Sequence, residues 1–316
     1  MLVRVVWLLL LICASSPSSA RQPPRDPFAS AQEIMKWIGG YRSRPEPERL
    51  PAAVAAMSRL GLFRDLEAGA VYVGFMAGVL GSEPERAERL VAAMFPMPPE
   101  DQVAIVRAIA YSGLPDWKEL LRRFAERMPA RKVLVARHLD DRLPTLPTLP
   151  LEGQPAALDT LWGYYFASAN MAPVERIVAV LPWARDTEKI DRITIGSMAK
   201  WTLANNALQD KPLLDHLTSE LDRQPPPVAR ELRDVIEAAE TFETGKIRKE
   251  ATAAMEELRR KGPESVRKFA FWGQAGQTAL AFGCVVAGAL GQPQIAVPCV
   301  IGGAASSAAM RIFAPQ

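Results

Sequence analysis

The sequence predicts an all-α protein, built as a helical repeat array that ends in an apolar helical hairpin. Three observations predict this fold class. Apolar residues recur every three or four positions in nearly every segment, and no segment alternates as a half-buried strand does. Many of the 27 prolines stand where a helix would begin, the position at which a helix tolerates proline best. A stretch of about 90 residues occurs twice with recognisable similarity.

The first element, residues 1–20, predicts a signal peptide. Arg4 supplies a positive charge, and residues 5–14 form an apolar run of about ten residues, whereas a bilayer span needs about 20. The small residues Ser18 and Ala20 fit cleavage after Ala20. An uncleaved anchor is one alternative. The other is a lipoprotein signal at Cys13, although such signals normally place a small residue where this chain has Ile12.

Export and composition together predict a compartment. The Ala- and Arg-rich composition with this signal indicates a Gram-negative bacterium. We therefore expect an exported protein, in the periplasm or on the periplasmic face of a membrane.

Residues 28–142 form the first predicted helical unit. Ala70, Val73, Ala77 and Leu80 follow the spacing of one helix face. The connections are short, as in 113–115, and short connections imply antiparallel neighbouring helices. Residues 143–155, LPTLPTLPLEGQP, follow as a Pro-rich linker, where the spaced prolines favour an extended, semi-rigid chain. We place a domain boundary there.

Residues 156–245 form the second predicted helical unit, which is rich in aromatic residues. The segment 162–166 carries aromatic residues on more than one side of a helix. Either this helix is central and buried nearly all round, or part of it lines a groove for a small or apolar ligand. The candidate groove residues are Trp162, Tyr164, Tyr165 and Trp201.

The two units resemble each other in sequence. Residues 88–94, ERLVAAM, match residues 175–181, ERIVAVL, at an offset of 87. Residues 74–76 lie opposite 163–165 at an offset of 89. A duplicated unit of about 90 residues would bury its apolar faces by stacking, as in an α-solenoid. Chance similarity between Ala- and Leu-rich helices is the alternative.

Residues 246–268 predict a charged connecting helix with eight basic and four acidic residues. It is either a solvated connector or a basic amphipathic helix that lies on anionic lipid. Residues 269–313 predict the apolar hairpin, because no charged residue occurs from 269 to 310 and the GQPQ turn at 291–294 divides this run. Its Gly, Ala and Ser content is typical of closely packed helices.

The hairpin has two readings that stay open. Membrane insertion is one, because the first apolar run is about one bilayer long. Soluble packing or self-association is the other, because Gln274, Gln277 and Pro298 interrupt the apolar runs and the flanking charges oppose the positive-inside rule. Cys284 and Cys299 lie on either side of the turn and are a candidate disulfide, with two buried thiols as the alternative.

Composition and motifs exclude several function classes. Lys and Arg total 38 and Asp and Glu total 35, giving +3, and the two signs are interspersed, so we expect no nucleic-acid binding. With two histidines and three cysteines we expect no metal site, and no cofactor motif occurs. Ser197 and Lys200 have S-x-x-K spacing but lack its companion motifs. His138 and His216 are expected on helix surfaces.

One tract supports a resemblance. LWGYYFASANMAPVERIVAVLPW, followed by ITIGSMAKWTLANNA, resembles segments of uncharacterised exported all-helical, α-solenoid-like proteins of proteobacteria. The similarity covers about 158–221 and implies no activity. In rhythm the chain also loosely resembles TPR or HEAT arrays.

These observations predict a non-enzymatic bacterial envelope protein. We expect a helical-repeat scaffold that presents its surface to a protein partner and is tethered, or self-associates as a homo-oligomer, through residues 269–313. The alternative function is a binding module for a small or apolar ligand in the aromatic groove. The identity of the partner or ligand does not follow from the sequence.

Overall fold

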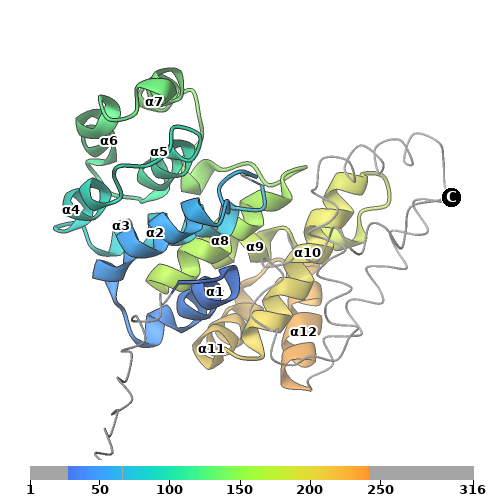
Figure 1. The fold of residues 1–316 in the computed structure, drawn as a ribbon. Coiled ribbons are helices and arrows are strands. Elements are labelled where there is room, and N and C mark those ends of the chain that lie inside the picture. The colour runs from blue at the N-terminus through green and yellow to red at the C-terminus, as the bar shows by residue number, and fades with distance from the viewer. Residues whose placement is uncertain (1–27, 66, 242–316) are drawn as a thin grey trace, which may run out of the picture.

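A computed structural model describes residues 28–65 and 67–241. Within these ranges the chain folds into twelve α-helices and six short 3-10 helices and contains no strand, so the prediction of an all-α protein is confirmed (Figure 1). The first group of α-helices is α1 (Ala31–Gly40), α2 (Leu50–Arg59), α3 (Ala70–Ser82), α4 (Ala87–Ala93), α5 (Gln102–Tyr111), α6 (Trp117–Ala125) and α7 (Lys132–Leu139). The second group is α8 (Pro155–Ser168), α9 (Ala172–Ala179), α10 (Ile190–Ala207), α11 (Lys211–Glu220) and α12 (Pro226–Glu240). The 3-10 helices are η1 (Tyr41–Ser43), η2 (Pro47–Arg49), η3 (Pro129–Arg131), η4 (Leu146–Thr148), η5 (Leu181–Arg185) and η6 (Leu221–Arg223).

Local signals in the sequence account for several helix starts. Ser30 caps α1, because its hydroxyl accepts a hydrogen bond from the backbone N–H of Glu33 at 3.2 Å. The Asp210 carboxylate accepts one from the N–H of Leu213 at the start of α11. Pro173 and Pro212 stand in the first turns of α9 and α11, where a helix loses no hydrogen bond to proline.

Helices α3 and α8 form the centre of the fold. Both are buried nearly all round, since residues 70–80 of α3 and 157–167 of α8 are buried without interruption. Of the two arrangements open for residues 162–166, the structure thus has the central, buried helix. The outer helices sit on either side of this pair: α4–α7 make one end of the molecule, and α10–α12 make the other (Figure 1).

The backbones of α3 and α8 approach each other at glycines. A Cβ atom added at Gly74 would lie 2.0 Å from the carbonyl oxygen of Thr160, and one at Gly163 would lie 2.1 Å from that of Val71. One turn further along, a Cβ at Gly78 would lie 2.6 Å from the carbonyl oxygen of Tyr164. From the pair Gly74–Thr160 to the pair Gly78–Tyr164 both members advance by four residues, so the two helices run parallel. A side chain at these positions would hold the helices apart.

The segment 143–155 packs against the body of the protein. It contains the single 3-10 turn η4, it ends at the first residue of α8, and its Leu146, Leu149 and Leu151 are buried. The Arg176 guanidinium on α9 donates hydrogen bonds to the carbonyls of Leu146 and Leu149. The prolines keep this stretch out of a helix, and its leucines fix it to the core. The domain boundary placed there stays a prediction.

Several predicted features lie outside the described residues. These are the signal peptide at 1–20, the connecting helix at 246–268, the hairpin at 269–313 and the candidate disulfide of Cys284 and Cys299. Among the residues that the structure does describe, no helix combines the length and the apolar character needed to cross a bilayer.

Candidate functional site

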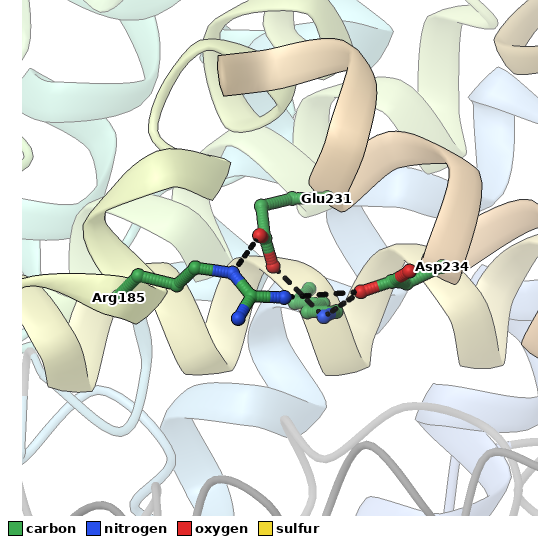
Figure 2. A network of polar contacts seen from close by, with 4 residues as sticks. Arg185, Glu231 and Asp234 are labelled. Atoms are coloured by element: carbon green, nitrogen blue, oxygen red, sulfur yellow. Dashed lines mark hydrogen bonds and ion pairs between the residues drawn. The ribbon is translucent and has the colours of Figure 1, made fainter. Parts of the chain in front are cut away.

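The most concentrated buried charge in the described part of the chain joins α10, α12 and η5. The Lys200 ammonium on α10 donates hydrogen bonds to Glu231 Oε2 at 2.8 Å and to Asp234 Oδ2 at 2.6 Å, both on α12. Arg185 at the end of η5 donates to the second oxygen of Glu231 and reaches Asp234 at 3.6 Å. Figure 2 shows Arg185 pointing toward the carboxylates of Glu231 and Asp234.

Two of the four charges in this network are buried, so losing a partner would destabilise the fold. The Glu231 side chain is 1% exposed and that of Lys200 is 6% exposed, whereas Arg185 and Asp234 are at the rim. Removing a charge from water is costly unless it is paired, and here each buried charge has two partners of opposite sign. Four charges that balance to zero therefore tie α10 to α12 and η5.

The geometry assigns the network a structural role more readily than a catalytic one. The Lys200 ammonium donates two hydrogen bonds to carboxylates, and Glu231 accepts bonds at both oxygens. Ser197 is buried one helical turn before Lys200. The amine that the S-x-x-K spacing would place beside this hydroxyl thus donates to two carboxylates of α12.

The sequence carried a signal for this network that the analysis of motifs missed. Glu231 lies within the apolar stripe of α12, between Val228 and Val235, both of which are buried. A charged residue on a buried helix face requires a buried partner of opposite charge. Periodicity therefore marks Glu231 as paired, but it does not say that the partner is Lys200.

A second polar cluster ties η1 to α8 and to the start of α11. The Tyr165 hydroxyl donates to Asp210 Oδ2 at 2.7 Å, and Arg42 of η1 pairs with the same carboxylate. The Arg42 guanidinium carbon also lies 4.4 Å from the centre of the Tyr165 ring. Burial raises the pKa of Tyr165, so its hydroxyl stays a donor. These contacts hold η1, α8 and α11 together.

The four aromatic residues predicted to line a groove lie as follows. Trp162 and Tyr165 are fully buried, Tyr164 is nearly so, and Trp201 is partly buried against the core. The Trp162 Nε1–H donates to Thr202 Oγ1 at 3.0 Å, and the Tyr164 hydroxyl donates to the carbonyl oxygen of Ser112 at 3.0 Å. Three of the four therefore fill the core, with their polar atoms bonded to protein groups, and only Trp201 is near solvent.

Two further titratable side chains are buried away from the network. Burial, with the nearby charge of Glu67, raises the pKa of Asp159 on α8 to about 8. Burial, with the charges of Arg107 and Arg137, lowers the pKa of His138 on α7 to about 4. His138 is only 2% exposed and lies edge-on to Tyr111, so the prediction of a surface histidine was wrong. Helix α7 has only eight residues, and its apolar and polar side chains were too few to tell its buried face from its exposed face.

The described residues contain no group of three or more His, Cys, Asp or Glu side chains arranged to hold a metal ion. Comparisons of the chain with protein-family models, with curated proteins and with solved structures found no match.

Proposed function

We propose that this protein is a non-enzymatic scaffold of the bacterial envelope, whose body is a duplicated helical unit. The contacts between α3 and α8 support the duplication. Gly74 meets Thr160, and Gly163 meets Val71. The two α3 positions in these contacts are 74 and 71, and adding the sequence offset of 89 to them gives the two α8 positions, 163 and 160. The contact is therefore reciprocal, as expected for two related units packed about an approximate two-fold axis.

The order of helices supports the same proposal. Helices α3–α7 are followed by a second set of five, α8–α12. Helices α4 and α9, which hold most of the matched ERLVAAM and ERIVAVL sequences, occupy the same place in each set. In a pair of this kind each unit covers an apolar face of the other and leaves an outer helical surface for binding. On this proposal α3 and α8 are the joint between units.

The proposed activity is binding of a protein partner, with tethering or self-association through residues 269–313. The observation that carries it is the backbone-to-backbone contact of α3 and α8, because it makes the two units one rigid support. The paired state of Lys200 also favours a structural over a catalytic use of the buried charges.

Two experiments test this proposal. In the first, the full-length chain and a version ending at Lys268 are fractionated after export. A tether predicts that only the full-length chain stays with the membrane fraction. Equal solubility of both chains in the periplasm without detergent would rule the tether out.

In the second experiment, a photo-crosslinking residue replaces one exposed side chain at a time on both units in living cells. Suitable positions are Glu85, Lys211 and Arg233, with the buried Leu161 as a negative control. A scaffold predicts discrete protein adducts from at least one face. A folded chain that gives no adduct at any exposed position would contradict the scaffold.

The alternative function, a small or apolar ligand held by Trp162, Tyr164, Tyr165 and Trp201, stays a prediction. It would require a rearrangement that exposes Trp162, since that side chain is fully buried.

A further inference from the structure

The outward face of α7 places apolar side chains between two cations. Successive residues of an α-helix are turned by about 100°, so four residues of α7 fall within an arc of about 140°. In order around that arc they are Lys132, Ala136, Val133 and Arg137, and all four are exposed. The opposite side of the helix is buried and includes His138. We call these four residues the α7 face.

The apolar centre of this face is unusually exposed. Val133 is 76% exposed, and the other large hydrophobic residue exposed in the described part of the chain, Leu60, is 38% exposed. Single exposed apolar residues are common on proteins. Here the exposed valine has the exposed Ala136 beside it and a cation at each edge, an arrangement that resembles the apolar core and charged rim of a protein interface.

Among the residues that the structure describes, the cations of the α7 face have no acidic partner. No ion pair joins Lys132 or Arg137 to a carboxylate among the described residues, whereas neighbouring α6 has its cations paired, as in Arg123 with Glu88. Arg131, just before α7, uses its Nε–H on the carbonyl oxygen of Pro99 at 2.9 Å and has no carboxylate partner in the described chain. Unpaired basic charge is thus concentrated at the outer end of the first unit, where Figure 1 places α7.

Net charge is also unevenly distributed along residues 28–241. Residues 102–142 carry nine basic and five acidic side chains, which gives +4. Residues 28–101 carry eight and ten, which gives −2, and residues 143–241 carry nine and fourteen, which gives −5. The α5–α7 region is therefore a basic end on an otherwise acidic body, and it attracts an acidic partner to one place.

We propose that the α7 face docks an acidic segment of a partner protein that sets an apolar side chain between carboxylates. This proposal rests on the proposed scaffold function and names its partner's chemistry. Two copies meeting through this face would bring like charges together. Phospholipid favours large apolar anchors, which Val133 and Ala136 do not supply, and a phosphate backbone would leave Val133 uncovered.

The test uses the full-length protein and a fluorescent helical peptide in which leucine lies between glutamates one turn away on each side. Binding is measured by anisotropy at low and at physiological salt. Control probes are the same peptide with lysine for glutamate, the same peptide with serine for leucine, vesicles with anionic lipid, and a single-stranded oligonucleotide. The variants are V133S, K132E/R137E and the matched control R230E/R233E, which reverses two exposed cations on α12.

We expect the acidic leucine peptide to bind and the lysine peptide not to bind. Reversing both cations should weaken binding by at least about tenfold, since two attractive contacts become repulsive. V133S should weaken it about fivefold, through the lost apolar burial, and R230E/R233E should leave it unchanged. The change with salt should shrink in K132E/R137E.

Binding that is equal in V133S, K132E/R137E and the wild type would overturn the proposal, as would failure of the acidic peptide to bind. Vesicle or oligonucleotide binding that depends on Lys132 and Arg137 would overturn it in favour of those ligands. If the acidic peptide does not bind while photo-crosslinked adducts still form at Glu85, Lys211 or Arg233, docking at the α7 face is ruled out and the scaffold function is retained. Loss of adducts at every position would contradict the scaffold itself.

Discussion

Replacing Gly163 by alanine tests the central joint of the fold. The new Cβ would lie 2.1 Å from the carbonyl oxygen of Val71 and 2.7 Å from the amide nitrogen of Phe75. Both atoms belong to the backbone of α3, so no side chain can rotate away. Ordinary contacts begin at 3.4 Å, and α3 and α8 would therefore have to separate by about 1 Å along this direction.

The loss in the free energy of unfolding follows from the packing contacts that α3 and α8 make. Overpacking a core costs about 1–3 kcal/mol and sometimes more, and a gap of about 0.5–1 Å forfeits a quarter to a half of each dispersion contact. Since both helices are buried along their length, we expect a loss of at least about 3 kcal/mol in the free energy of unfolding. For a body of this size that lowers the melting temperature by about 6–12 °C.

The assay is urea and thermal unfolding of the full-length chain, followed by tryptophan fluorescence. Gly40 in α1 gives the matched control, because a Cβ added there meets nothing within 4 Å. Gly40→Ala should stabilise by about 0.4–1 kcal/mol, since alanine is the better helix former. Gly74→Ala should behave as Gly163→Ala does, and the double variant should cost less than the two single costs together, because the first separation makes room for the second.

The reasoning would be refuted by a Gly163→Ala protein as stable as the wild type with an unchanged denaturant slope. Strict additivity of Gly74→Ala and Gly163→Ala would refute the shared joint, even if each alone were destabilising.

Three further predictions concern buried titratable side chains. Lys200→Met should cost about 3–5 kcal/mol, because Glu231 keeps only the rim-exposed Arg185, and adding Glu231→Gln should recover part of that loss in equilibrium unfolding. The pKa of Asp159 is about 8 in the folded protein, above its value of 3.8 in the unfolded chain. Its contribution to stability is therefore full below about pH 4 and falls by at most about 1.4 kcal/mol per pH unit up to about pH 8. Asp159→Asn should remove that pH dependence from the melting temperature. The pKa of His138 is about 4 when folded, below 6.5 when unfolded, so stability should fall as the pH drops from 6.5 to 4, and a His138→Leu protein measured over that range should lose less.

Features of the site that depend on neighbouring residues could be predicted from the sequence, whereas contacts between distant helices could not. The aromatic run at 162–166 indicated a helix that is either central or groove-lining, and the structure shows it buried. The pairing of Lys200 with Glu231, 31 positions away, could not be predicted, because it depends on how α10 and α12 cross. His138 was misassigned for a related reason, since the cover over α7 comes from Tyr111 on α5.

By itself the sequence determined the helical class, the helix starts at proline and at capping residues, and the apolar stripes of the outer helices. These are local properties, because a helix is built from hydrogen bonds four residues apart and its stripe from a period of 3.6 residues. Only the tertiary structure decided that Gly74 and Gly163 meet the opposite backbone, and that four charges balance at Lys200. Both depend on the crossing of helices distant in sequence, where packing has to fill space and every buried charge needs a partner.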